Sequence, residues 1–189
     1  MVLKYPSERF NNTMDAAVRF LARDNHKNVA KLFHKTGYTC ELETHKGTFF
    51  ESVILNEQGG VAEVKIFWGI SASTEHTEEV NKYIELVNKY QEYICCSGID
   101  STGRIYSTTA ISFEPCEISV DFFHCMEDAC FSAIDMFLAP LLVVNSGKNT
   151  AENAFRSAVK EDDLYLDPTL EERIRLMNLY LELKNKEDN

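Results

Sequence analysis

The sequence lacks every short motif that by itself indicates a chemistry. It contains no GxxxxGK[ST] or GxGxxG loop for phosphate groups, no HExxH zinc motif, no GxSxG nucleophile motif and no CxxC pair. These absences make an enzyme less expected, although a catalytic site assembled from distant residues leaves no local motif. From motifs alone we predict no catalytic residue, no cofactor and no metal ion.

Basic side chains are scarce as well. The chain has 19 Lys and Arg against 30 Asp and Glu, which gives a net charge of −11 at pH 7 and a pI of about 4.9. Because so acidic a chain repels polyanions, nucleic acid is not expected as a partner, whereas a basic protein is compatible with the charge.

The amino-terminal residues lack the apolar run of a signal peptide, since charges and Pro6 occur within MVLKYPSERFNNTM. The six cysteines lack the spacing of a zinc site, and a domain with a full apolar core does not need disulfides. We therefore expect free thiols in a cytoplasmic protein. For the neighbours Cys95 and Cys96 we expect one thiol toward the core and one outward, with a vicinal disulfide or a soft-metal site as the alternatives.

A stretch long enough to cross a membrane is also missing. The most apolar segment, DFFHCMEDACFSAIDMFLAPLLVV (Asp121–Val144), is interrupted by Asp135 and contains Pro140. A span needs about 20 apolar residues, and an Asp in mid-membrane adds roughly 2.5–3.5 kcal/mol against insertion. We predict instead a core helix that ends or kinks near Pro140 and covers a sheet with a wide apolar face.

The other face of this helix carries His124 and Asp128, four residues apart. That spacing would suit a carboxylate–histidine metal site, but we interpret it as a solvated helix face. The remaining histidines, at positions 26, 34, 45 and 76, fall at predicted helix ends or turns and have no repeated acidic partner.

What the sequence does contain is enough apolar residues for one substantial core, because 44% of its 189 residues are hydrophobic. Helical spacing predicts a helix from Thr13, its N-cap, to Gly37, either continuous or broken within Asp24–Asn28. The later elements are strands over 38–45, 48–60 and 61–71, a helix over 73–91, two strands within 92–114 joined at DSTG, helices capped by Ser119 and Thr150, and a last helix from about Thr169.

This order places the helices on one face of a five-stranded antiparallel sheet, an α+β arrangement. In this order of elements, the chain resembles the YbjN-like group, which shares the architecture of type III secretion chaperones. The resemblance rests on the order α-β-β-β-α-β-β-α over residues 13–144 and on a hairpin that leads through FEPCEISVDFF into a long apolar helix. It implies a small non-catalytic protein that acts through protein–protein contact, as acidic, dimeric secretion chaperones of this shape do. It brings no catalytic residue.

The resemblance divides the chain into a chaperone-like α+β domain, residues 1–149, and a helical extension, residues 150–189. In the extension an apolar stripe recurs at Leu170, Ile174, Met177 and Leu181. We predict that this stripe packs on the same domain or on a second copy of the chain, which makes it the candidate interaction site.

The leading prediction is therefore a cytoplasmic protein-interaction or chaperone-like module that forms a homodimer. Two alternatives stay open. One is an enzyme or small-ligand binder with an apolar pocket between the sheet and the long helix, lined by Phe67, Trp68 and Tyr106. The other is metal binding through the cysteines.

Overall fold

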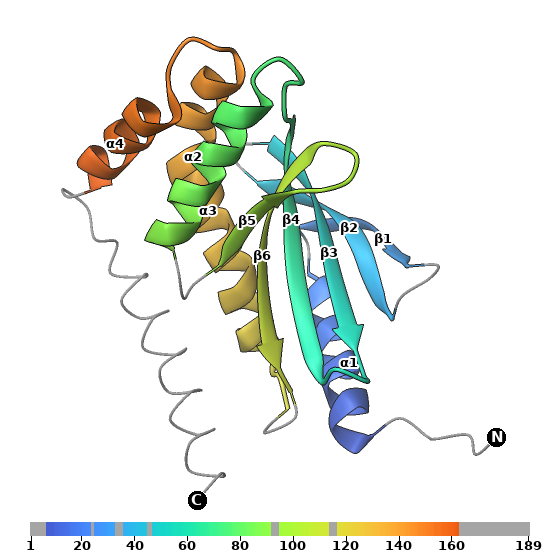
Figure 1. The fold of residues 1–189 in the computed structure, drawn as a ribbon. Coiled ribbons are helices and arrows are strands. Elements are labelled where there is room, and N and C mark those ends of the chain that lie inside the picture. Colours follow the sequence, from blue (N-terminus) through green and yellow to red (C-terminus); the bar gives the residue numbers. More distant parts are fainter. Residues whose placement is uncertain are drawn as a thin grey trace, which may run out of the picture.

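The computed structural model describes residues 7–23, 25–32, 36–44, 47–91, 95–113 and 117–162. Within them the chain forms an α+β fold, an antiparallel sheet with helices packed against it (Figure 1). The elements in chain order are α1 (Glu8–Leu21), β1 (His26–Lys31), β2 (Gly37–Thr44), β3 (Gly47–Asn56), β4 (Val61–Ser71), α2 (Thr77–Tyr90), β5 (Cys96–Ile99), β6 (Arg104–Ser112), α3 (Val120–Asn145) and α4 (Ala151–Asp162).

The sheet has six strands in the order β1-β2-β3-β4-β6-β5, and every neighbouring pair is antiparallel. The predicted class is confirmed, and so are the five predicted strands, which correspond to β2–β6. The predicted number of strands is wrong by one, because β1 adds an edge strand beside β2.

This extra strand comes from the second half of the first predicted helix. α1 starts after Ser7, whose side chain accepts a hydrogen bond from the Phe10 amide, whereas Thr13, the predicted cap, is fully buried inside the helix. Five of the six residues of His26–Lys31 are exposed. They offer no apolar stripe for a helix to bury, and pairing with β2 satisfies their backbone groups instead.

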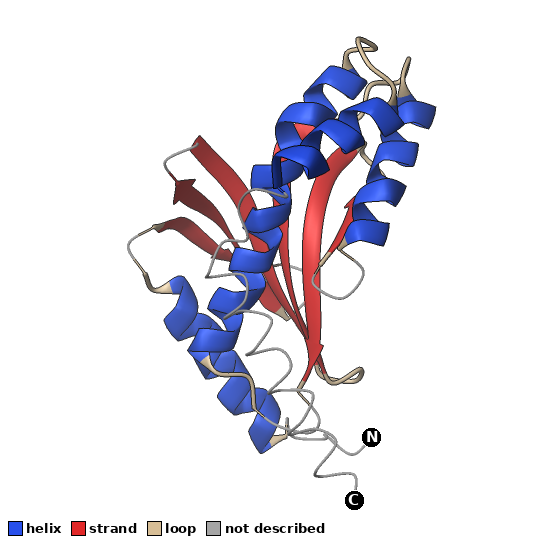
Figure 2. Ribbon diagram, turned by 90° about the vertical axis from the view of Figure 1, so that its left-hand side faces the viewer, coloured by secondary structure: helices blue, strands red, loops and turns tan. Residues whose placement is uncertain are grey.

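Alternation along the strands gives the sheet two different faces. On β4, for example, Ala62, Val64, Ile66 and Trp68 are buried, whereas the residues between them are half-buried. We call the buried side, which the helices cover, the helix face and the other side the open face; the layers are visible in Figure 2. The core therefore lies between one side of the sheet and the helices.

α3 is the main cover of the helix face, as predicted. Its N-cap is Ser119, and its buried residues include Phe123, Met126, Ile134 and Phe137. Of the two outcomes predicted at Pro140, an end or a kink, the end is excluded, since α3 continues to Asn145. Buried Leu141 and Val144 anchor this last turn in the core.

α2 and α4 complete the core at one end of the sheet. Tyr83 of α2 packs edge-on against Phe137 of α3 and Phe155 of α4, and the last two rings are stacked 6.0 Å apart. Lys82 forms an ion pair with Glu152 at 2.8 Å. The first helix of the predicted extension thus contacts the α+β domain, while the segment from residue 163 lies outside the described residues.

None of the described helices is both long and apolar enough to cross a bilayer.

Candidate functional site

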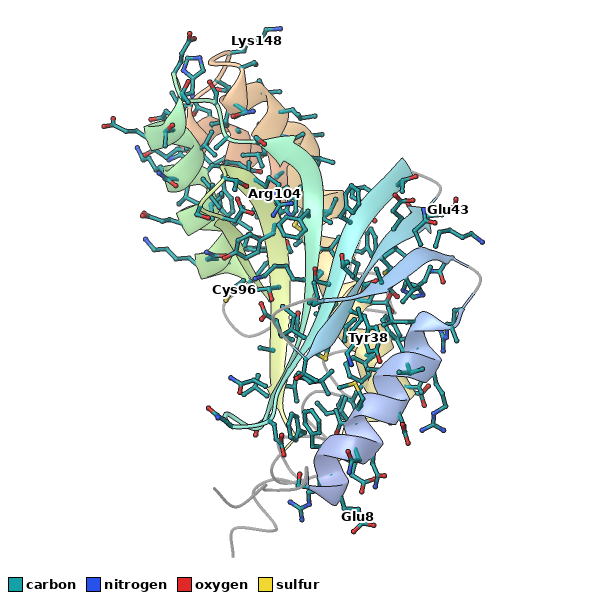
Figure 3. The ribbon with its side chains drawn as sticks, turned by 90° about the vertical axis from the view of Figure 1, so that its right-hand side faces the viewer. Glu8, Tyr38, Glu43, Cys96, Arg104 and Lys148 are labelled. Carbon is teal, nitrogen blue, oxygen red and sulfur yellow. The ribbon has the colours of Figure 1, made fainter. Side chains whose placement is uncertain are left out.

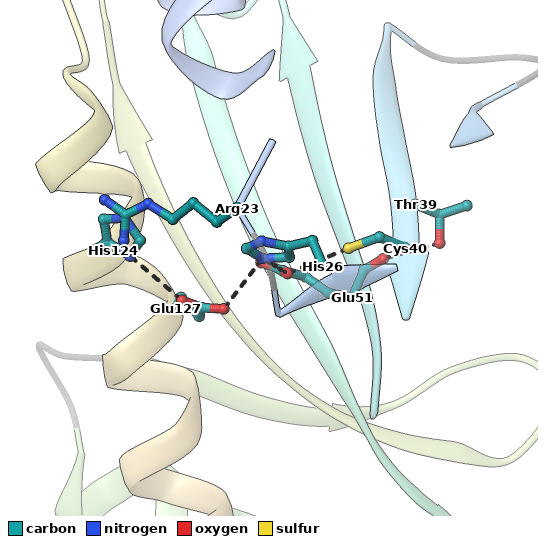
Figure 4. A network of polar contacts seen from close by, with 7 residues as sticks. All are labelled: Arg23, His26, Thr39, Cys40, Glu51, His124 and Glu127. Carbon is teal, nitrogen blue, oxygen red and sulfur yellow. Dashed lines mark hydrogen bonds and ion pairs between the residues drawn. The ribbon is translucent and has the colours of Figure 1, made fainter. Parts of the chain in front are cut away.

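A cluster of ionisable side chains is buried between the sheet and α3. Three neighbouring strands supply His26, Cys40 and Glu51 from β1, β2 and β3, and α3 supplies Glu127 (Figure 4). Cys40 and Glu51 are direct register partners, so both point to the helix face. The side chains of His26 and Glu51 are completely buried, and that of Glu127 is 8% exposed. We call these four residues the buried cluster.

The contacts within the buried cluster converge on one imidazole nitrogen and one carboxylate. Nε2 of His26 lies 3.0 Å from Oε2 of Glu51 and 3.4 Å from Oε1 of Glu127. The Cys40 thiol donates to the same Oε2 of Glu51 at 3.5 Å. A single imidazole edge therefore faces two carboxylates.

Burial and charge act against each other in this cluster. Burial pushes the pKa of His26 down, but the contacts with Glu127 and Glu51 outweigh it, and the pKa rises to about 9. Burial raises the pKa of Glu51 against the opposing contact with His26. Burial, together with the nearby Glu51, also raises the pKa of the Cys40 thiol. Without a further cation, a proton on His26 is the counter-charge of the carboxylates.

A second histidine extends the cluster toward the surface. Arg23, just after α1, lies with its Nη1 3.0 Å from Nδ1 of His124. A guanidinium can only donate, so this nitrogen accepts and His124 is neutral. Burial and the Arg23 charge accordingly lower the pKa of His124. Oε2 of Glu127, 3.5 Å from the same nitrogen, therefore receives no proton from His124.

Several polar atoms of this region are buried without a hydrogen bond. Among the described residues, Nδ1 of His26, Oε1 of Glu51, Nε2 of His124 and Oε1 of Glu127 have no hydrogen-bond partner. Buried polar groups are normally paired, because desolvation without a partner is costly. The ligand atoms of His26, Cys40 and Glu51 all lie within 4.8 Å of one another, so these three could hold a metal ion.

The meeting of these four side chains was not predicted from the sequence. The sequence predicts His26 within the first helix or at a break in it, and only its position in β1 turns it toward Glu51. His124, interpreted as part of a solvated face, is half-buried with its side chain 20% exposed, and it contacts Arg23 and Glu127. One signal was present: Glu51 occupies an inward position between Phe49 and Val53 in the alternation of β3, where an apolar residue is expected.

The expectation of free thiols is confirmed for four of the cysteines. Cys40, Cys95, Cys96 and Cys130 are free thiols. Of the neighbouring pair, Cys95 is buried and Cys96 is exposed, as the strand alternation requires.

A second candidate surface lies on the open face. Phe50, Phe67 and Tyr106 are register partners across β3, β4 and β6, and Phe50 is 57% exposed. The guanidinium of Arg104 lies 4.3 Å above the Phe67 ring, and Lys65 lies 4.5 Å above that of Tyr106. Arg104, labelled in Figure 3, lies on the same side of β6 as Tyr106, because buried Ile105 between them points to the helix face. We call these three aromatic residues the aromatic row.

The predicted pocket residues do not share a pocket. Trp68 is buried on the helix face, where its Nε1 donates to Ser107 Oγ at 2.8 Å. Phe67 and Tyr106 belong to the open face, because neighbouring residues of a strand point to opposite sides. The predicted interaction stripe Leu170, Ile174, Met177 and Leu181 lies outside the described residues.

No protein-family model matches the chain, and no curated protein matches it. Among solved structures, a chain in the crystal structure of the ExsC–ExsE complex is similar, with a TM-score of 0.47 and 10% sequence identity. The match covers 71% of this chain and 94% of that chain. So distant a likeness carries no conclusion about function, and the resemblance to YbjN-like proteins stays a prediction.

Proposed function

We propose that this chain is a non-catalytic cytoplasmic protein-interaction module, and that the open face of its sheet binds the carboxy-terminal segment, residues 168–189, of a second copy. The aromatic row is the observation that carries the proposal. It aligns three aromatic side chains on the open face, where Phe50 is 57% exposed and Phe67 and Tyr106 are half-buried. Exposed apolar patches on soluble proteins commonly mark contacts with other proteins.

Contact through the face is favoured because both edges of the sheet are protected. At one edge, β1 has an irregular register between Lys27 and Ala30, and Asn28 has a φ of 51°. At the other, Asn88 of α2 hydrogen-bonds to the backbone of Ser97 in β5. Irregular or covered edges discourage the addition of a further strand.

The carboxy-terminal segment suits this face in pattern and in length. Its stripe of Leu170, Ile174, Met177 and Leu181 needs an apolar surface to cover it. As a helix, 22 residues extend about 33 Å. The 11 residues of β4 extend about 36 Å. The helix can therefore lie along the strands over the aromatic row.

The contact should depend mainly on apolar burial. The two cations beside the aromatic row already have partners, since Lys65 pairs with Glu63 at 3.0 Å and Arg104 with Asp100 at 2.8 Å. Two copies with a net charge of −11 each repel one another. Added salt screens this repulsion, so self-association should strengthen as the salt concentration rises.

Light scattering on the full-length protein tests the proposal. We expect a dimer at micromolar concentration that becomes a monomer in Phe50→Ser on the face and in Ile174→Ser in the segment. Leu142→Ser is the matched control, because Leu142 is 46% exposed on α3 and should leave the dimer intact.

A mixture of the two disrupted variants distinguishes this arrangement from others. Phe50→Ser retains an intact segment and Ile174→Ser an intact face, so together they should form a heterodimer with one native contact. A dimer that survives Phe50→Ser would indicate pairing of segment with segment and would overturn the proposed contact. If the wild-type protein is a monomer at high micromolar concentration, the proposed self-association is wrong. The segment would then pack on its own domain or bind another protein.

A further inference from the structure

The buried cluster contains more acceptors than donors. His26 Nε2 and the Cys40 thiol are its donors, whereas two carboxylates contribute four oxygens. Oε1 of Glu51 is fully buried and has no hydrogen-bond partner among the described residues, and Oε1 of Glu127 has only the ion-pair contact with His26. A group with more positive charge than one proton would satisfy these oxygens.

The types of ligand atom select among cations. An imidazole nitrogen, a thiolate sulfur and carboxylate oxygens together suit Zn²⁺, whereas Mg²⁺ and Ca²⁺ prefer oxygen alone. Four protein ligands from four elements would leave no open position, which is the usual arrangement of a structural zinc site.

Three of the distances in the cluster are close to the edges of a tetrahedron around zinc, and the ligand atoms of His26, Cys40 and Glu51 all lie within 4.8 Å of one another. With the usual zinc–ligand distances, the edge from nitrogen to oxygen is about 3.3 Å and the edge from sulfur to oxygen about 3.5 Å. The two N–O distances from His26 are 3.0 Å to Glu51 and 3.4 Å to Glu127. The S–O distance from Cys40 to Glu51 is 3.5 Å.

We propose that His26 Nε2, Cys40 Sγ and a carboxylate oxygen of Glu51 bind a single Zn²⁺ ion, and that Glu127, whose Oε1 lies 3.4 Å from His26 Nε2, moves in as the fourth ligand. Binding would release the thiol proton of Cys40 and the proton on His26 Nε2 into solvent. Glu127, the ligand with some solvent exposure, lies where the ion would enter.

The ion would join the edge strand β1 to α3 through β2 and β3. β1 contributes a single buried residue, His26, so a bond at this point would hold the strand more firmly than its side-chain packing does. The site lies on the helix face and the aromatic row on the open face. The zinc proposal is therefore independent of the proposed function.

Zinc binding to the full-length protein is measured after removal of metal with a chelator. We expect about one equivalent of Zn²⁺ by elemental analysis after dialysis, and the same stoichiometry in a competition titration with a chromophoric chelator. Co²⁺ in place of zinc should give the intense visible bands of a tetrahedral site and a near-ultraviolet absorption from sulfur-to-cobalt charge transfer.

Substitutions of the proposed ligands test which residues bind the ion. Because loss of even a second-shell partner weakens metal binding by about 10–100-fold, Cys40→Ser and His26→Gln should weaken zinc binding at least about 100-fold. Cys40→Ser should also abolish the sulfur-to-cobalt absorption. The matched control is Cys130→Ser, which removes another buried thiol that contacts Thr109 and should leave both readouts unchanged.

Circular dichroism of each metal-free variant shows whether it has folded, and the wild-type titration decides the proposal even if a variant does not fold. Absence of zinc binding by the wild type would overturn it. So would one equivalent bound with unchanged affinity by folded Cys40→Ser and His26→Gln, since the ion would then lie elsewhere.

Discussion

The side-chain amide of Asn88 on α2 pairs with both backbone polar groups of Ser97 on β5. Its Nδ2 donates to the Ser97 carbonyl oxygen at 2.9 Å, and the Ser97 amide donates to its Oδ1 at 2.7 Å. Because β5 is an edge strand, these groups would otherwise be free to pair with another chain. A side chain thus takes the place of a neighbouring strand.

Replacing this amide should expose the edge. Asn88→Ala removes two hydrogen bonds to a partly buried backbone, and we expect the free energy of unfolding to fall by about 1–3 kcal/mol. Urea unfolding measures the loss. Asn12→Ala is the control, because its single hydrogen bond to Glu117 is exposed and its removal should cost less than about 0.5 kcal/mol. Equal losses in the two variants would contradict this role of Asn88.

A buried chain of hydrogen bonds should make Ser107 more important than Ser97. Trp68 donates to Ser107 Oγ at 2.8 Å, and the two serine hydroxyls lie 3.1 Å apart. Ser107→Ala leaves a buried indole N–H without an acceptor, so we expect a loss of about 1–3 kcal/mol. Ser97→Ala should cost less, because Ser107 still accepts from Trp68. The emission of this single tryptophan follows unfolding in both variants, and a larger loss in Ser97→Ala would refute the order.

The hairpin between β5 and β6 should respond to acid through Asp100. Hydrogen bonds from Thr102, and then from Arg104, hold the pKa of this carboxyl well below its usual range. A depressed pKa means that the stabilisation is complete above the unfolded pKa of about 3.9 and is lost as the pH falls from there toward the folded pKa.

Carboxyl NMR shifts should therefore give Asp100 a midpoint below about 3.9. In Thr102→Ala, which lacks the strongest donor, the midpoint should move back toward the usual value. Stability should fall less steeply with acid in Asp100→Asn than in the wild type, because the variant cannot titrate here. An ordinary midpoint for Asp100 in the wild type would show that these hydrogen bonds do not favour the carboxylate.

Phe155 should anchor α4 to the rest of the protein. Its ring stacks on Phe137 and contacts Tyr83 and Tyr90. Truncating a fully buried Phe costs about 3–5 kcal/mol, so for half-buried Phe155→Ala we expect about 2–3 kcal/mol, with faster hydrogen exchange throughout α4. Arg156→Ala, one residue further on the exposed side, should change neither quantity. Unaltered exchange in Phe155→Ala would mean that other contacts hold the helix.

Some elements could be predicted because their local pattern agrees with their tertiary environment. The alternation of β3 and β4 and the apolar face of α3 each bury one side, as periodicity requires. β1 could not be predicted in this way, since His26 is its only buried residue and no alternation marks the strand. The contact of His124 with Arg23 was equally invisible, because the two residues lie 101 positions apart in the chain.

The sequence by itself determined the apolar faces of β3, β4 and α3, the α+β class and the strongly acidic charge, because these depend on composition and on short-range periodicity. Only the tertiary structure decided that His26, Cys40, Glu51 and Glu127 meet. Four elements must be brought into register before these side chains touch, and no local pattern encodes the distance between strands or the helix that covers them.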